Sequence, residues 1–177
     1  VVAVALNKDR LNINYTGINS LSDLAPIGYA NGSLTFTDAN GGAITASNIE
    51  TLYVNDKEYV LYLGTATNPG NAIWGVADKT LYGLEVQSGW GSNLSASNGL
   101  ANLSGFNLLS DNFTYVGNAG RDDMSLNITR SSFLGVFNVS TGAGDDIILS
   151  ARLIDGDSVD LGAGDDTIYE LANNVNS

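Results

Sequence analysis

The chain has 177 residues, 44% of them hydrophobic, which is enough for one large domain or two small ones with a proper core. It carries 7 basic and 19 acidic residues, and the resulting net charge of −12 disfavours binding to the phosphates of a nucleic acid. Because it contains neither Cys nor His, disulfides, thiolate metal sites and Ser-His-Asp or Cys-His catalytic sets are excluded. We therefore expect no catalytic residues and no enzymatic activity. No apolar run is long enough to predict insertion into a membrane.

The segment 1–110 predicts strands joined by short polar turns. Three pairs of β-branched or aromatic runs each flank a four-residue polar turn, as is typical of β-hairpins: Val1–Leu6 with Leu11–Tyr15, Thr51–Val54 with Tyr59–Leu63, and Ala72–Val76 with Leu81–Val86. Ser33–Thr37 alternates polar and apolar residues, which predicts a half-buried strand, and Asn40-Gly41-Gly42 predicts a turn. A short helix is expected only over Leu100–Leu109.

Aromatic residues gather in the middle of the chain, where Trp74, Tyr82 and Trp90 follow one another closely. Aromatic rings stack on sugars and peptides at sites that have one dry and one wet side. These three residues are therefore candidates for binding a glycan or a peptide. Packing in the core is the alternative, and it is the better interpretation of any single ring. Trp90, flanked by two glycines, is the best candidate for an exposed one.

A five-residue phrase, Gly-Ala-Gly-Asp-Asp, occurs at residues 142–146 and again at residues 162–166. Glycine permits backbone conformations that other residues avoid, so a Gly-x-Gly turn can aim several carbonyl oxygens inward. The following Asp adds a carboxylate. Ca²⁺ selects hard oxygen ligands of both kinds, so each copy is a candidate calcium-binding turn. The alternative is a pair of Gly/Asp-rich turns that hold no ion.

Both copies fit a known nonapeptide, Gly-Gly-x-Gly-x-Asp-x-apolar-x, which binds Ca²⁺ in parallel β-helices. Thr141–Leu149 and Leu161–Tyr169 match it at every defined position except the first Gly. Two weaker copies are Arg152–Asp160, which keeps Asp157 and Val159, and Gly117–Ser125, which keeps Gly120, Asp122 and Met124. On these residues the C-terminal third resembles the RTX (repeats-in-toxin) family of secreted bacterial proteins. Ile49–Leu52 (Ile-Glu-Thr-Leu) is similar to a strand element of RTX-type surface-layer proteins and large adhesins.

The resemblance implies a right-handed parallel β-roll, in which turns on one side recur about every 18 residues. The steps from Gly120 to Gly144 and from Gly144 to Gly164 both exceed this repeat, so the laps are longer or contain bulges. The strong copies should stack on one edge, with Asp155-Gly156-Asp157 turning at the opposite edge. The candidate metal residues are Gly142, Gly144, Asp145, Asp146, Gly162, Gly164, Asp165 and Asp166, followed by Asp155, Asp157, Gly120 and Asp122.

The distribution of charge agrees with a bound cation. Residues 111–177 hold 11 acids and 3 bases, whereas the longer segment 1–110 holds 8 acids and 4 bases. Carboxylates crowded into turns repel one another and weaken a compact state unless a cation neutralises them. Because metal-binding free energy is then folding free energy, we expect the C-terminal third to be loose without Ca²⁺ and ordered with it. A merely acidic, solvated surface is the alternative.

We therefore predict an all-β extracellular protein. Residues 1–110 form β-hairpins packed as a sandwich or an irregular β-helix, and residues 111–177 form the parallel β-roll. The expected function is structural: a Ca²⁺-stabilised, self-associating block of a bacterial surface layer, adhesin or biofilm matrix fibre that meets other cell-surface components. The resemblance to RTX proteins implies secretion by a type I route. Two alternatives stay open. One is a glycan- or peptide-binding module with the roll as spacer, and the other is the non-catalytic tail of a secreted enzyme.

Overall fold

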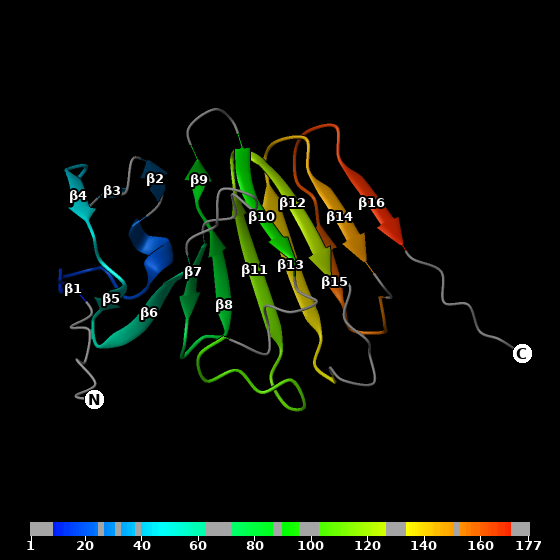
Figure 1. Cartoon of the computed structure of the whole chain (residues 1–177), viewed down its shortest axis with the longest axis horizontal. Helices are drawn as coiled ribbons and strands as arrows, with labels where there is room; N and C mark the ends of the chain where they lie inside the picture. Colours follow the sequence, from blue (N-terminus) through cyan, green and yellow to red (C-terminus); the bar gives the residue numbers. More distant parts are fainter. Residues whose placement is uncertain are drawn as a thin grey trace, which may run out of the picture.

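The structure is a computed structural model that describes residues 9–24, 27–30, 33–37, 40–62, 72–86, 90–95, 103–126, 134–150 and 153–170. Within these ranges the chain is all-β, as predicted: its strands form two sheets, and the one helical segment is the 3₁₀ turn η1 (Leu21–Leu24) (Figure 1). None of the helical structure in these ranges is long and apolar enough to cross a membrane.

Each sheet contains eight strands. Sheet A has the order β1-β5-β6-β7-β8-β11-β13-β15, with the bounds β1 Arg10–Ile13, β5 Thr51–Val54, β6 Lys57–Tyr62, β7 Ala72–Gly75, β8 Thr80–Gly83, β11 Phe113–Asn118, β13 Phe137–Gly142 and β15 Ser158–Asp160. Sheet B has the order β16-β14-β12-β10-β9-β2-β3-β4, with the bounds β2 Gly28–Ala30, β3 Ser33–Thr37, β4 Ala43–Ser47, β9 Glu85–Val86, β10 Trp90–Ser95, β12 Arg121–Leu126, β14 Ile147–Ser150 and β16 Thr167–Glu170.

Antiparallel hairpins build the N-terminal part of both sheets. β5 pairs with β6, β7 with β8, and β3 with β4. Asn55 and Asp56, between β5 and β6, have φ angles of 45° and 65°, the backbone of a two-residue hairpin turn that matches the twist of its strands. These pairings confirm the hairpins predicted around residues 55–58 and 77–80 and the strand predicted at Ser33–Thr37.

Two predictions of local structure come out differently. β1 pairs in parallel with β5, and its predicted hairpin partner, Val1–Leu6, lies outside the described residues. The helix predicted over Leu100–Leu109 is wrong from residue 103 onward, where the chain forms bends and turns. There Asn107 Oδ1 accepts the backbone N–H two residues on, and the Asp111 carboxylate accepts the N–H of Asn107. Such local acceptors compete with helical hydrogen bonds.

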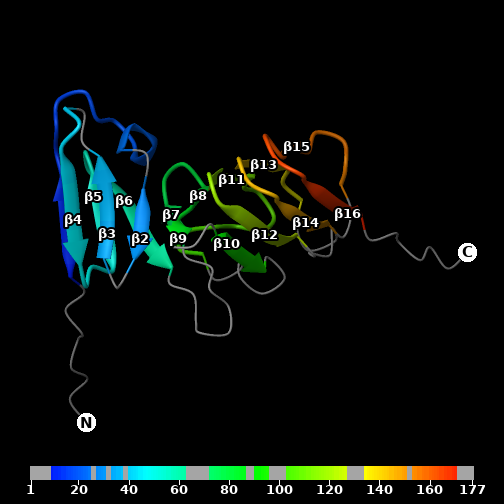
Figure 2. The same cartoon turned by 90° about the horizontal axis from the view of Figure 1, so that it is seen from above.

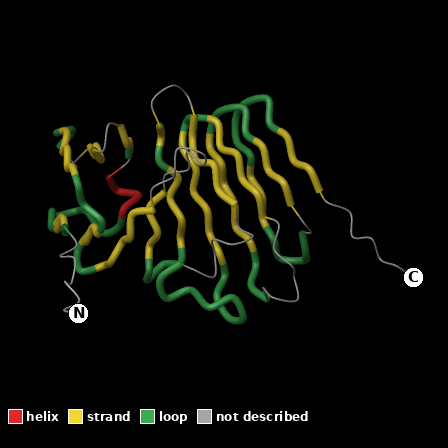
Figure 3. Tube along the Cα trace, in the orientation of Figure 1, coloured by secondary structure: helices red, strands yellow, loops and turns green. Residues whose placement is uncertain are grey.

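From β11 onward the chain alternates between the sheets, one strand at a time, and we call one pass through both sheets a lap. β11, β13 and β15 are parallel neighbours in sheet A, and β12, β14 and β16 are parallel neighbours in sheet B. Phe113 is the register partner of Phe137, and Ile148 is the register partner of Ile168. These two steps along the chain equal the steps from Gly120 to Gly144 and from Gly144 to Gly164, so the glycine–aspartate turns give the length of each lap. Figure 3 shows the connecting loops gathered at the two ends of these strands.

Within the described residues the molecule has two hydrophobic cores. Figure 2 shows the N-terminal strands at one end of the long axis and the strands from β11 onward toward the other. The N-terminal core includes Phe36 and Tyr59, and the C-terminal core includes Tyr115. β7 serves both, because Ile73 packs into the N-terminal core whereas Trp74 packs into the C-terminal one. All four residues of β7 are buried.

The predicted division of the chain at residue 110 stays a prediction. Both sheets continue across it, since β8 pairs with β11 in sheet A and β10 pairs with β12 in sheet B. The C-terminal core also takes Trp74 and Leu81 from before that position. The glycine–aspartate turns therefore sit on a scaffold to which both parts of the sequence contribute.

Candidate metal centre in the stacked turns

Three turns that connect sheet A to sheet B stand over one another at one edge of the molecule. Ala143 and Ala163 form an isolated parallel bridge: the N–H of Ala163 donates to the Gly142 carbonyl (3.0 Å), and the N–H of Gly144 donates to the Ala163 carbonyl (2.8 Å). The N–H of Ala143 donates in turn to the Asn118 carbonyl (3.0 Å) of the preceding turn. The two strong copies of the phrase thus stack one lap apart, as predicted.

Three aspartates form a column along this stack: Asp122, Asp146 and Asp166. Asp146 Oδ1 accepts the backbone N–H of Asp122 (2.8 Å), and Asp166 Oδ1 accepts the N–H of Asp146 (3.0 Å). These two carboxylates therefore each bind the backbone of the lap before them. Asp122 and Asp146 are both 0% exposed, although carboxylates are almost never fully buried without charged or hydrogen-bonding partners.

The second oxygen of Asp146 is the most informative atom of the column. Within the described part of the chain, Asp146 Oδ2 is buried and has no hydrogen-bond partner. A buried carboxylate oxygen without a partner costs about 1–3 kcal/mol or more. A cation in contact with this oxygen removes that penalty, so the atom marks where the turns can bind one.

Backbone carbonyls approach the next lap closely at the glycines of the phrase. A Cβ at Gly162 would overlap the Gly142 carbonyl oxygen, and a Cβ at Gly164 would overlap the Gly144 carbonyl oxygen. Gly162 also has a φ of +79°, which side-chain-bearing residues rarely adopt. The two glycines therefore let the carbonyl oxygens of one turn lie against the backbone of the next.

A second pair of aspartates lies at the exposed rim of the two strong turns. Asp145 Oδ1 accepts the N–H of Asp165 (3.0 Å) in a solvent-exposed hydrogen bond. In the upstream turn the equivalent register position belongs to Arg121, which forms an ion pair with Asp123 (2.9 Å). Hydrogen bonding to Asp123 raises the pKa of Arg121, and the charges of the nearby carboxylates, Asp145 among them, raise it further. The Gly120 turn thus already holds a cationic group.

The donor set suits calcium better than a metal held by side chains alone. Among the described residues, no group of three or more His, Cys, Asp or Glu side chains could hold a metal ion. Ca²⁺ takes six to eight oxygens and accepts carbonyls beside carboxylates. Asp146 and Asp166 supply carboxylates, and Gly142 and Gly144 supply carbonyls from the same pair of turns. The two strong copies therefore supply oxygens of both kinds that Ca²⁺ selects.

The candidates at the opposite edge are not brought to these turns. The segment with Asp155 and Asp157 connects β14 to β15, whereas the stacked turns connect sheet A to sheet B (Figure 1). Asp157 binds the backbone with both oxygens: Oδ1 accepts the N–H of Phe137 (2.9 Å) and Oδ2 that of Ile154 (2.8 Å). Asp155 is exposed. Asp157 therefore holds the backbone of its own turn and of the neighbouring strand.

Two residues of the stack were not among the predicted site residues. Thr141 is 0% exposed, and its Oγ1 donates to the Leu161 carbonyl of the next lap (2.8 Å). Gly117 has no room for a Cβ, because the Thr141 carbonyl and Asp122 Oδ2 occupy that space. Gly117, Thr141 and Leu161 all hold the first position of the nonapeptide. The departure from Gly at position 141 is the sequence signal that points to Thr141, whereas Gly117 keeps the glycine of the repeat.

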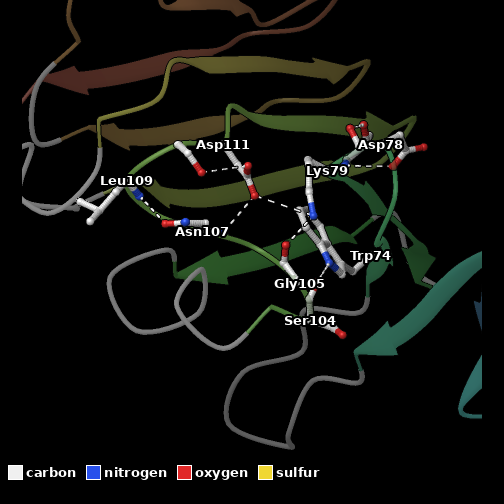
Figure 4. Close-up of polar contacts among 10 residues, drawn as sticks. Trp74, Asp78, Lys79, Ser104, Gly105, Asn107, Leu109 and Asp111 are labelled. Atoms are coloured by element: carbon white, nitrogen blue, oxygen red, sulfur yellow. Dashed lines mark hydrogen bonds and ion pairs between the residues drawn. The ribbon is translucent and has the colours of Figure 1, made fainter.

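The aromatic candidates lie away from the turns. Trp74 is 0% exposed, its indole N–H donates to the Ser104 carbonyl (2.8 Å), and its ring stacks on Phe113. Lys79 ties the same loop down through the Gly105 carbonyl and an ion pair with Asp111 (3.7 Å) (Figure 4). Trp74 is thus part of the C-terminal core and presents no ring face at the surface.

Tyr82 and Trp90 complete the aromatic set. Tyr82 is partly buried, and its hydroxyl donates to Asp78 Oδ2 (2.9 Å), while its ring meets Tyr59 edge to face. Burial, together with the Asp78 charge, raises the pKa of Tyr82. Trp90 begins β10, but its side chain lies outside the described part of the structure. Trp74 and Tyr82 therefore do not contribute an open ring face to the predicted glycan- or peptide-binding surface.

Comparisons with known proteins leave the site as the main guide to function. No protein-family model matches this chain, and no curated protein or solved structure matches it either.

Proposed function

We propose that this chain is a calcium-stabilised structural module of an extracellular bacterial assembly, such as a surface layer, an adhesin or a matrix fibre. In this proposal the laps from β11 to β16 are a right-handed parallel β-roll, and the N-terminal hairpins form a sandwich that continues from it. The resemblance to RTX proteins and the acidic composition motivate the extracellular location. The role is architectural, so no catalytic residues are assigned.

The observation that carries the proposal is the aspartate column with its buried, unpartnered oxygen. Asp146 Oδ2 has no partner in the described part of the chain, and its turn stacks on the next one through the close approach at Gly162 and Gly164. A bound Ca²⁺ supplies positive charge to carboxylates that otherwise repel one another. The chain supplies the carboxylates of Asp146 and Asp166, and the interlap hydrogen bonds hold them in register.

Sedimentation velocity in chelator and in millimolar Ca²⁺ tests the proposal, since extracellular calcium modules bind with dissociation constants of about 10⁻⁴–10⁻³ M. At a protein concentration low enough to keep the chain monomeric, we expect a compact species with Ca²⁺ and an expanded one in chelator. Mg²⁺ is the control, because it demands near-ideal octahedral geometry and retains its waters. An unchanged sedimentation coefficient in all three buffers would refute the proposed calcium binding. Equal compaction by Mg²⁺ would mean that any divalent cation screens the carboxylates and that the turns do not bind Ca²⁺ specifically.

A further inference from the structure

Within the described residues each sheet has an edge strand at both ends of the molecule. β15 and β16 lie together at one end, which we call the tail, and β1 and β4 lie at the other, which we call the head (Figure 1). An edge strand presents N–H and C=O groups that can pair with another chain. Both ends of both sheets are therefore potential sites of strand addition.

The tail exposes side chains that are buried one lap earlier. Ile148 is 0% exposed, whereas its register partner Ile168 is 41% exposed. Val139 is 3% exposed, and its partner Val159 is only partly buried. The inner apolar row thus runs to the last described strands of the stack. A further pair of strands stacked on β15 and β16 would cover this row.

The head offers a matching apolar row with a different charge. Ile44 and Ala46 alternate with exposed residues on β4, and Leu11 of β1 packs against the N-terminal core. The one charged residue of β1 and β4 is Arg10, whose guanidinium carbon lies 3.8 Å from the centroid of the Tyr53 ring. Residues 153–170 at the tail contain six acids and no base.

We propose that the tail of one copy docks on the head of a second copy, with β15 and β16 meeting β1 and β4. Two tails would bring together two segments with six acids each, whereas a tail on a head meets two uncharged apolar rows beside Arg10 and only two neighbouring acids, Asp9 and Glu50. A contact between unlike surfaces does not close on itself unless the rotation permits a ring, so repeated addition gives an open filament. The inference rests on the proposed function, since Ca²⁺ is needed to order the tail.

Variants that block one end test this arrangement by complementation. Ile168→Lys places a charge on the tail, and Ile44→Lys places one on the head. We expect wild type in millimolar Ca²⁺ to form large species in sedimentation equilibrium, and each variant alone to stay at monomer mass. A 1:1 mixture of the two variants should form a dimer, because each retains one intact end. Val116→Lys, on a 39% exposed residue of β11 away from both ends, is the matched control and should assemble like wild type.

Other outcomes overturn the arrangement. Dimerisation of Ile44→Lys alone would mean that tails pair with tails. Assembly of both variants like wild type, or a monomeric wild type, would also overturn it. Calorimetric Ca²⁺ titration of wild type and of each variant separates the docking proposal from the proposed function. Normal Ca²⁺ binding by a wild type that does not assemble refutes the docking alone. Assembly that chelator does not affect refutes the calcium dependence. If Ile168→Lys fails to bind Ca²⁺, Tyr169→Lys, at a 55% exposed position of β16, replaces it.

Discussion

The two cores of this protein are held together by different means. In the N-terminal core, large apolar side chains such as Phe36 and Tyr59 pack between hairpins formed by neighbouring segments of the chain. In the C-terminal part, strands of successive laps stack in parallel, and Asp122, Thr141 and Asp146 are buried in or next to the turns between them. The N-terminal part is stabilised by apolar packing and by local hydrogen bonds such as those to Asp23, whereas the C-terminal part also buries carboxylates, which in the proposed function a cation offsets. Four predictions test this difference.

The largest effect is expected from removing the indole that packs in the C-terminal core. Trp74→Ala deletes a fully buried ring and its hydrogen bond to Ser104, so we expect a loss of about 3–5 kcal/mol in the free energy of unfolding. Urea denaturation in saturating Ca²⁺ measures this loss, because the C-terminal core that contains Trp74 is then ordered. Tyr15→Ala, at a 45% exposed position, is the control and should change stability by no more than about 0.5 kcal/mol. A loss below about 1 kcal/mol for Trp74→Ala would mean that the core is wrongly described.

The second prediction separates two costs of adding a Cβ to a glycine in the stacked turns: the steric overlap with a neighbouring atom and the strain of a positive φ. Gly162 and Gly41 have nearly equal φ angles of +79° and +80°, but a Cβ at Gly162 meets the Gly142 carbonyl whereas a Cβ at Gly41 meets nothing within 4 Å. Gly41→Ala should cost about 1–2 kcal/mol from the backbone alone. Gly162→Ala should cost about 1–3 kcal/mol more, from overpacking. Thermal unfolding of both variants in Ca²⁺ measures the difference, and equal costs would contradict the close stacking of the turns.

A third prediction concerns Asp146 and is expected to depend on Ca²⁺. Asp146→Asn keeps a side-chain acceptor for the Asp122 N–H but removes the negative charge. In chelator we expect stability equal to or above that of wild type, because a buried charge is gone. In saturating Ca²⁺ the variant should lack most of the stabilisation of wild type, about 2.7 kcal/mol at a hundredfold excess over the dissociation constant. Asp155→Asn, exposed at the opposite edge, should respond to Ca²⁺ like wild type. The same Ca²⁺ response in both variants would exclude Asp146 as a ligand.

The smallest effect is expected in the N-terminal part and is independent of Ca²⁺. Hydrogen bonds from the backbone N–H groups of Asn19 and Ser20 lower the pKa of Asp23 below its ordinary value of 3.8. Because the folded pKa is the lower one, the contribution to stability is present above 3.8 and is lost as the pH falls through the folded pKa. Urea midpoints at pH 7 and pH 3 should therefore differ less for Asp23→Asn than for wild type. An equal difference would assign no role to this carboxylate.

The sequence predicts best what depends on neighbouring residues. The hairpin around Asn55-Asp56 follows from two β-rich runs and a turn pair that tolerates positive φ. The stacking of the Gly144 and Gly164 turns follows from the repetition of one phrase, because a repeated turn in a parallel stack must recur once per lap. In both cases the signal lies within a short stretch or in the repeat itself.

The remainder depends on contacts between segments far apart in the sequence. That Trp74 faces one core while Ile73 faces the other follows only from the packing of both sheets around β7. The helix expected near Leu109 is replaced by turns, because Asn107 and Asp111 bind their own backbone. The role of Thr141 depends on the Leu161 carbonyl of the next lap, which no local pattern reveals.

Hydrogen exchange, followed by mass spectrometry in chelator and in millimolar Ca²⁺, tests the central claim most directly. The rate of slow exchange reports the free energy of local opening, so one experiment measures this free energy separately for the N-terminal and C-terminal parts of the chain. We predict that Ca²⁺ slows exchange strongly at β13, β14, β15 and β16 and leaves β3, β5 and β6 nearly unchanged. Equal protection of β13–β16 in both buffers would contradict the account, because the aspartate column would then be stable without a cation.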